Sequence, residues 1–146
     1  MSKRAGQDCL FCQIARHEVN AHAVFEDAQS MAFLDHRPLF PGHCLLIPKP
    51  HFQTLPELPA ALVGPLFLQA QRLALAVEAG MSAEGTFVAL NNKVSQSVPH
   101  LHIHIVPRRK KDGLKGFFWP RHKYADEAHA LESVQRIRNA LESVSK

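Results

Sequence analysis

The sequence predicts an α+β protein in which an antiparallel sheet packs against helices. Short segments of alternating apolar and polar residues, typical of strands, occur early and late in the chain. A long segment with apolar residues at helical spacing separates the two groups. Turn-prone residues bound the expected strands, which lie at residues 23–26, 31–34, 43–47, 86–90 and 100–106.

The long central segment, residues 62–77, is predicted to be a helix. Pro65 is expected in or near its first turn, where a missing N–H costs little. Gly80 offers a stop at the C-terminal end. The apolar residues at helical spacing are Leu62, Leu66, Leu73 and Val77.

A second helix is expected at residues 126–144, with Asp126 as its N-terminal cap. A short helix is expected at residues 9–16. The chain shows no internal repeat, low-complexity tract or linker, so all 146 residues are predicted to form one domain, with a motif-bearing core at 9–110 and a basic extension and helix at 111–146. The second helix carries one apolar stripe, made of Leu131, Val134, Ile137, Leu141 and Val144.

Composition bounds the class of protein. A hydrophobic content of 46% supports a folded globule with a real core rather than a disordered chain. The polar N-terminus lacks the apolar run of a signal peptide. No segment is expected to approach the length of a membrane span, which is about 18 apolar residues. A cytoplasmic protein with no membrane partner is therefore expected.

Three cysteines are an odd number, so a disulfide framework is not expected. Cys9 and Cys12 form a Cys-x-x-Cys pair, which in a reducing compartment indicates metal or redox chemistry, although simple packing would look the same. Cys44 lies in an apolar run and is expected to pack in the core.

The formal charge of +4 is modest, but basic residues cluster late in the chain. Such a cluster fits a polyanionic ligand, and equally fits a solvated charged surface; nucleic acid also stays open, because a basic patch does not specify which phosphates it attracts. The cluster consists of Arg108, Arg109, Lys110, Lys111, Lys115, Arg121 and Lys123.

Three histidines, His100, His102 and His104, occupy alternate positions in the last expected strand. Alternate residues of a strand share a face, so the three imidazoles would lie on one face and the apolar residues between them on the other. Neighbouring imidazolium charges repel near the reference pKa of about 6.5, so the pattern favours proton handling, metal ligation or phosphate binding over a chance surface.

The run His100-Leu-His102-Ile-His104-Ile-Val106 resembles the signature of the histidine triad (HIT) superfamily of nucleotide hydrolases and transferases. The resemblance implies the HIT fold and covers about residues 9 to 110. The chain departs from the family in a loop at 91–96 that lacks the usual glycines and looks about two residues short, and in residues 113–121, which have no counterpart in the commonest branches. Further matches, in the family's order, are Cys9-Leu-Phe-Cys12-Gln-Ile, Phe25-Glu-Asp27, Ala32-Phe-Leu-Asp35, Pro41-Gly-His43, Ile47-Pro-Lys-Pro-His51 and Asn91.

The resemblance implies the catalytic roles. His102 would attack the α-phosphate of a nucleotide conjugate and form a covalent nucleotidyl-histidine that water then hydrolyses. His104 would stabilise charge on the phosphate oxygens, and Ser97 would donate a hydrogen bond to the leaving group. His43 would buttress the triad, whose first member is His100.

The resemblance also implies the substrate contacts. Asn91 and Gln96 match phosphate contacts, and Asp35 would accept hydrogen bonds from the ribose hydroxyls. A stacking pocket would hold the base without strongly selecting one base. Its walls would be Leu10, Phe11, Ile14, Phe33 and His36.

Bacterial members that share this N-terminus imply a structural zinc ion. Its ligands would be Cys9, Cys12, His51 and His100, the soft-thiolate and imidazole set that zinc prefers in closed tetrahedral sites. No organic cofactor is expected.

The leading hypothesis is an enzyme that acts on a purine nucleotide or dinucleotide. The ending Val106-Pro-Arg108 resembles the dinucleoside polyphosphate branch of the family more than the phosphoramidase branch, which implies a dinucleoside polyphosphate as substrate, with a nucleoside phosphoramidate next. The alternatives are a nucleotide- or zinc-binding regulatory module without turnover, and a nucleic-acid-binding protein. A homodimer is expected, and nucleic acid is not the expected partner.

Overall fold

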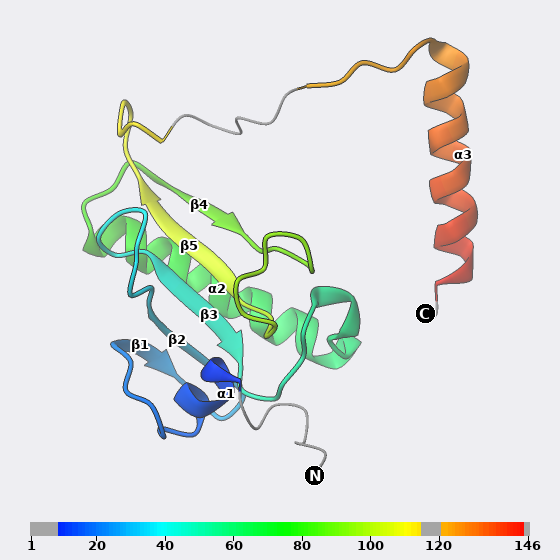
Figure 1. The fold of residues 1–146 in the computed structure, drawn as a ribbon. Helices are drawn as coiled ribbons and strands as arrows, with labels where there is room; N and C mark the ends of the chain where they lie inside the picture. Colours follow the sequence, from blue (N-terminus) through cyan, green and yellow to red (C-terminus); the bar gives the residue numbers. More distant parts are fainter. Residues whose placement is uncertain (1–8, 115–120, 145–146) are drawn as a thin grey trace. The chain divides into compact units, whose positions relative to one another are not determined.

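The computed structural model describes residues 9–114 and 121–144 (Figure 1). The chain forms two compact units, residues 1–112 and 113–146, and each is described by itself. The single domain of 146 residues stays a prediction. Lys115 of the basic cluster and residues 115–120 lie outside the described residues.

The first unit is built on a five-stranded sheet in which every neighbouring pair is antiparallel. The strand order is β1-β2-β3-β5-β4, so β1 and β4 form the edges (Figure 1). This sheet, a long central helix and a C-terminal helix confirm the predicted α+β class. The strands are β1 Ala23–Glu26, β2 Ser30–Leu34, β3 Cys44–Pro48, β4 Gly85–Ala89 and β5 Ile103–Arg108.

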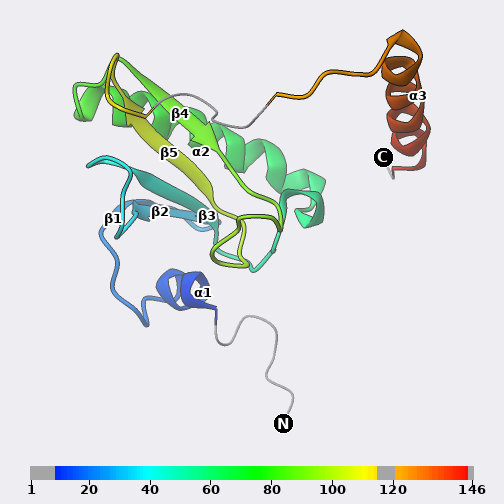
Figure 2. The ribbon, with the colours of Figure 1, turned by 45° about the horizontal axis from the view of Figure 1, so that its top comes forward.

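Two helices cover opposite faces of the sheet, as Figure 2 shows. On one face lies α2 (Ala60–Gly80), preceded by a short 3-10 turn, η1 (Leu55–Glu57). On the other lies the short helix α1 (Leu10–Ala15). Because side chains alternate along a strand, β3 contributes to both layers. Leu46 packs on the α2 side, whereas Leu45 and Ile47 pack on the α1 side.

The helix α2 is longer than the sequence predicted and begins at Ala60. Pro65 is therefore its sixth residue and lies near the first turn, as expected, rather than within it. By length and apolar composition alone α2 could cross a membrane, so the expectation that no segment reaches that size was wrong. A core helix meets the same criterion, and one side of α2 is buried in the core through Leu66, Ala70, Leu73 and Val77. The cytoplasmic location stays a prediction.

The strand β5 begins at Ile103, so the expected strand from residue 100 is shorter than predicted. The segment before it is still held in place, because the backbone N–H of Leu101 donates to the Phe52 carbonyl at 2.7 Å. The predicted alternation persists through this segment: Leu101, Ile103 and Ile105 are fully buried in the α2-side core. Apolar packing thus fixes the positions from which the three histidines project on the other side.

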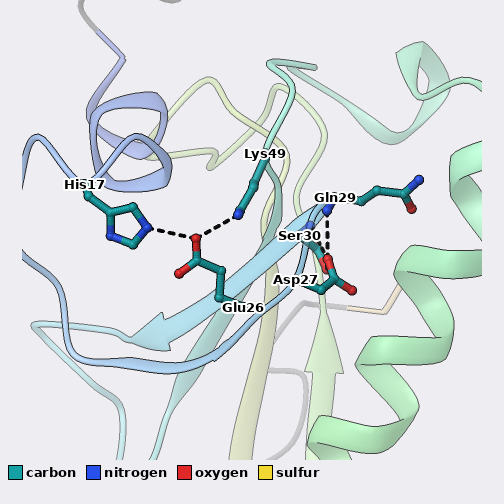
Figure 3. Close-up of polar contacts among 6 residues, drawn as sticks. All are labelled: His17, Glu26, Asp27, Gln29, Ser30 and Lys49. Carbon is teal, nitrogen blue, oxygen red and sulfur yellow. Dashed lines mark hydrogen bonds and ion pairs between the residues drawn. The ribbon is translucent and has the colours of Figure 1, made fainter.

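A polar bridge ties the loop after α1 to the sheet (Figure 3). Glu26 Oε1 lies 2.7 Å from Lys49 Nζ, just past β3, and 2.8 Å from His17 Nε2, in that loop. The neighbouring Asp27 closes the β1–β2 turn, because its Oδ1 accepts the backbone N–H groups of Gln29 and Ser30 (Figure 3). These contacts hold the α1–β1 loop against the strands.

The turn before β3 requires a glycine. Gly42 has φ of +93°, a conformation that L side chains rarely adopt. A Cβ at this position would also lie 2.5 Å from Cγ of Met81. The turn sets the entry of His43, the next residue, into the interior.

The second unit contains α3 (Glu127–Ser143). Asp126 caps it as predicted, because its side chain accepts the backbone N–H of His129 at 2.8 Å. The predicted apolar stripe is present but exposed, and none of the described α3 residues is buried. Its members Leu131, Val134, Ile137, Leu141 and Val144 are each between 42% and 68% exposed.

Candidate active site and metal centre

A cavity of about 390 Å³ opens on the α1 side of the sheet. Its floor comes from three adjacent strands in register, because Phe33 pairs with Leu45, and Leu45 pairs with His104. The structure brings together most residues expected to bind or react with a substrate. Those that line the cavity are Leu10, Phe11, Ile14, Phe33, Asp35, His36, Ser97, His102 and His104.

Sequence reasoning missed the loop between α1 and β1, which lines the same cavity. Val19, Asn20, Ala21 and His22 carry no motif, so no pattern marked them. Their polar members Asn20 and His22 are exposed. Only the path of the chain, held by the Glu26 bridge, brings this loop to the cavity. The remaining lining residues that were not expected are Leu34, Leu45 and Val98.

His102 is 3% exposed and lines the cavity. Its Nδ1 lies 2.7 Å from the main-chain carbonyl oxygen of His100, which can only accept a hydrogen bond. The Nδ1 therefore carries the proton, and in the neutral ring the lone pair is on Nε2. The edge-to-face contact with Phe11, with ring centroids 5.1 Å apart, holds the ring in this orientation.

His104 lies beside His102, with ring centroids 4.9 Å apart. Burial, followed by the neighbouring His102 and His43, lowers the pKa of His104 to about 4. Its Nδ1 lies 3.0 Å from Nε2 of His43, which burial also keeps below its ordinary pKa. At neutral pH both rings are neutral, so a phosphate would meet a polar donor and not a fixed cation.

Asp35 sits at the rim of this group. Its Oδ1 accepts the backbone N–H of Arg37 at 2.9 Å, which orients the carboxylate. Its Oδ2 lies 3.7 Å from His43 Nε2, too far for a hydrogen bond. The carboxylate lines the cavity, as a ribose contact requires.

Asn91 and Gln96 are not among the residues that line this cavity. The Asn91 side chain donates to the Ser95 carbonyl, and Gln96 donates to the Gln53 carbonyl at 2.6 Å. Gln96 Oε1 also accepts the backbone N–H of Lys93 at 3.0 Å, so both amides hold the 91–96 loop together. In this loop Lys93 and Ser95 adopt positive φ without the help of glycine. Their predicted role in phosphate binding stays a prediction.

The four residues of the predicted metal site converge. The ligand atoms of Cys9, Cys12, His51 and His100 all lie within 4.8 Å of one another, and we call this group the Cys/His cluster. It joins the start of α1 to the segment after β3 and to the first triad histidine. Sequence spacing indicated the cysteine pair, but only the fold brings the two histidines to it.

Distances within the Cys/His cluster match a tetrahedral site. Cys12 Sγ lies 3.2 Å from His51 Nδ1 and 3.4 Å from His100 Nδ1, and the two Nδ1 atoms are 3.2 Å apart. Ligands about 2.0–2.3 Å from a tetrahedral zinc lie about 3.3–3.8 Å from one another.

Protonation of the cluster is also suited to a metal. His100 Nε2 lies 2.7 Å from the Pro48 carbonyl and must donate to it, so Nδ1 presents its lone pair to the sulfurs. Burial lowers the pKa of His100 to about 4 and so favours the neutral ring. Burial raises the pKa of Cys12 to about 11, so a bound metal would displace the thiol proton.

Arg108, the first residue of the basic cluster, lies away from the triad along β5. Arg108 is four residues beyond His104 on the strand, which corresponds to about 13 Å, and pairs with Gly85 at the far end of β4. Its guanidinium contacts Asp112, with Nε 2.6 Å from Oδ2. Arg108 does not line the His102 cavity, so a phosphate held at its guanidinium would lie outside that cavity.

The antiparallel sheet presents two adjacent imidazoles, His102 and His104, to a largely apolar cavity, and these features point to a histidine-triad class of protein. The HIT domain family model matches residues 16–111. The chain belongs to the HIT domain family.

Two similar proteins have named activities. Adenylylsulfatase HINT3 of Arabidopsis thaliana is 32% identical over 140 residues, which cover 94% of this chain and 66% of that protein. Adenosine 5'-monophosphoramidase HNT1 of Saccharomyces cerevisiae is 36% identical over 110 residues, which cover 73% of this chain and 66% of that protein. The chain thus spans just under two thirds of the length of each.

Solved structures show the same fold. SMU.412c from Streptococcus mutans UA159 has a TM-score of 0.85 and 29% identity, covering 97% of this chain and 91% of that chain. A Zn-bound histidine triad family protein from Mycobacterium smegmatis has a TM-score of 0.71 and 32% identity, covering 93% of this chain and 99% of that chain.

The low pKa of His104 predicts a loss of stability in acid. The unfolded chain takes up a proton near pH 6.5, whereas the folded ring resists protonation down to about pH 4, so stability falls as pH falls through this window. By pH 5 the loss from this group amounts to about 2 kcal/mol. Urea unfolding at pH 7 and pH 5 should show a smaller loss for His104→Gln than for the parent. An equal loss in both proteins would contradict the assignment.

Proposed function

We propose that this protein is a nucleotidyl hydrolase or transferase that cleaves at the α-phosphate of a nucleotide conjugate. The observation that carries the proposal is the hydrogen bond from His102 Nδ1 to the His100 carbonyl, which puts the lone pair on Nε2 of a ring that lines the cavity. Neutral imidazole is a competent nucleophile at neutral pH. The apolar walls at Phe11, Ile14 and Phe33 suit a base, and Asp35 suits a ribose.

The reaction takes two displacements. The Nε2 lone pair of His102 attacks the α-phosphorus, a P–N bond forms, and the bond from phosphorus to the leaving group breaks. The leaving group departs with the bonding electron pair and takes a proton from solvent, and the Ser97 hydroxyl at the cavity wall is the proposed donor of a hydrogen bond to it. Water then attacks the same phosphorus and loses a proton to solvent, the P–N bond breaks with its electron pair returning to His102 Nε2, and the nucleoside monophosphate is released. In each step His104 donates toward the phosphate oxygens.

The favoured substrates share an adenylyl group. The named activities of the two relatives, on an adenylyl sulfate and on an adenosine phosphoramidate, differ in the leaving group but not in the nucleotide. We therefore propose a purine nucleoside 5'-phosphoryl group in the cavity. The candidate substrates differ in the leaving group. It would be a nucleoside phosphate from a dinucleoside polyphosphate, which Val106-Pro-Arg108 favours, an amine from a phosphoramidate, or sulfate from an adenylyl sulfate.

His102→Ala should abolish turnover while leaving nucleotide binding largely intact, because the base and ribose contacts lie elsewhere in the cavity. His104→Ala should reduce kcat by about 10²–10³-fold through the loss of one preorganised donor. A panel of diadenosine polyphosphate, adenosine phosphoramidate and adenylyl sulfate would measure turnover, and mass spectrometry would detect the adduct. His122→Ala, a histidine outside the lining of this cavity, is the matched control.

Hydrolysis by the His102→Ala protein at the parent rate would contradict the covalent mechanism. Nucleotide binding without turnover on any member of the panel would favour the regulatory module instead. Salt-sensitive binding of DNA or RNA, with little affinity for mononucleotides, would favour a nucleic-acid-binding protein.

We propose that the Cys/His cluster holds a structural zinc ion. Two thiolates and two imidazoles within 4.8 Å supply a closed set of four protein ligands, as structural sites do. The similar protein from Mycobacterium smegmatis is Zn-bound. The ion would tie α1 to the segment that carries His100, and so would support the carbonyl that orients His102.

Metal analysis of protein purified without chelator should find about one zinc ion per chain. Cys12→Ser should remove most of it and lower the free energy of unfolding by about 2 kcal/mol or more, because the metal binds only the folded state. Cys44→Ala is the matched control, since Cys44 is a buried thiol outside the cluster. Unchanged metal content and stability in Cys9→Ser and Cys12→Ser would contradict the proposed zinc site.

We also propose a homodimer formed through α2 and the edge strand β4. The outward side of α2 exposes Phe67, Leu68 and Leu75, and Val88 on β4 is 43% exposed. An edge strand otherwise presents unpaired backbone groups. Sedimentation at micromolar concentration should give a dimer, and Leu68→Glu should shift it to monomer. A monomeric parent would exclude the interface.

A further inference from the structure

His43 is held between a backbone donor and the last triad histidine. The backbone N–H of Leu39 donates to His43 Nδ1 at 3.1 Å. On the other side of the ring, His43 Nε2 lies 3.0 Å from His104 Nδ1. A backbone N–H can only donate, so His43 Nδ1 must be the acceptor.

This single contact determines the direction of the next one. His43 is 3% exposed and burial lowers its pKa, so the ring is neutral and carries one proton. With Nδ1 accepting, that proton is on Nε2, which then donates to His104 Nδ1. His104 must therefore carry its own proton on Nε2.

We infer that the backbone N–H of Leu39, acting through His43, sets the tautomer of His104, so that His102 and His104 present opposite functions to a substrate. His102 has its proton on Nδ1 and a lone pair on Nε2, because it donates to the His100 carbonyl. His104 has a lone pair on Nδ1 and a donor on Nε2. Leu39 and His43 are thus positioning residues, and their catalytic consequence rests on the proposed function.

The same contact decides between two groups of potential metal ligands. Asp35, His43 and His104 also lie within 4.8 Å of one another. A neutral histidine binds a metal through the nitrogen that lacks the proton, and in His43 that nitrogen already accepts from Leu39. In the Cys/His cluster the reverse holds, because His100 donates from Nε2 to the Pro48 carbonyl and keeps Nδ1 free for a metal. The Asp35 group is therefore a hydrogen-bond relay and not a metal site.

The hydrogen-bond chain from Leu39 through His43 to His104, which we call the relay, would strengthen the hydrogen bond from His104 to a phosphate. When His104 Nε2–H donates to a phosphate oxygen that gains negative charge, its Nδ1 becomes a better acceptor for His43. Hydrogen bonds in such a chain strengthen one another. A ring with the opposite tautomer would turn a lone pair toward the anionic phosphate and repel it.

Nuclear magnetic resonance of ¹⁵N-histidine protein reads the tautomers directly and needs no substrate. Long-range ¹H–¹⁵N correlations should show His43 and His104 protonated on Nε2 and His102 on Nδ1. With uniform ¹⁵N labelling, scalar couplings across the N–H···N bonds should link Leu39 N to His43 Nδ1, and His43 Nε2 to His104 Nδ1. Protonation of His104 on Nδ1, or no coupling from Leu39 to His43, overturns the inference.

Two variants test whether the relay is required. Leu39→Pro removes the N–H and Leu39→Ala keeps it; the side chain is 53% exposed, so Ala is a matched control. His43→Leu removes the donor to His104 and serves if the proline variant does not fold. In Leu39→Pro or His43→Leu, the His104 ¹⁵N shifts should move toward averaged values, whereas Leu39→Ala should keep the parent pattern. Unchanged shifts in a folded His43→Leu protein would overturn the inference.

Kinetics separates this inference from the proposed function. If the protein turns over a nucleotide conjugate, His43→Leu should lower kcat by about 10²-fold with a smaller change in KM, because a misdirected His104 loses a contact made in the transition state. If no conjugate is turned over, the proposed function fails while the tautomer measurements still decide the relay.

Discussion

Main-chain groups control the chemistry of this site by occupying one nitrogen of each interior imidazole. The Pro48 carbonyl accepts a hydrogen bond from Nε2 of His100, and the His100 carbonyl accepts one from Nδ1 of His102. A carbonyl can only accept and a backbone N–H can only donate, so neither contact leaves the position of the ring proton open. Three histidines that are equivalent in a motif thereby differ in which ring nitrogen carries the lone pair, and the proposed roles of metal ligand, nucleophile and donor rest on that difference.

The sheet fixes the positions of these two carbonyl groups. The carbonyl of Pro48 ends β3, and that of His100 lies just before β5, which pairs with β3. On the other face of the same backbone, Leu101, Ile103 and Ile105 are fully buried against the α2 side. A shift of one residue would turn the imidazoles into the α2-side core and remove Leu101, Ile103 and Ile105 from it, so the loss of apolar packing opposes such a shift and preserves the site.

The N-terminal segment completes the site from the opposite side of the cavity. Phe11 packs at the edge of His102 and of Phe33, while Cys9 and Cys12 reach His100. Under the proposed function, α1 and its N-cap residue Cys9 would supply both a wall for a base and half of a metal site. A metal that fastened this helix would act on the geometry of the nucleophile through His100, without touching the substrate.

The amino-acid sequence by itself determined the class of fold, the strand faces and the cap at Asp126, because periodicity and capping patterns are local properties of the chain. The family motif predicts which residues react, and that assignment stays a prediction. The sequence did not mark the Val19–His22 loop, the exposure of α3 or the roles of the Asn91 and Gln96 amides within their loop. Only the tertiary structure decided which nitrogen of each histidine is protonated. That choice depends on hydrogen bonds across strands and turns, such as Leu39 to His43 and His43 to His104, and a pattern along the chain contains no information on which backbone group will face a ring.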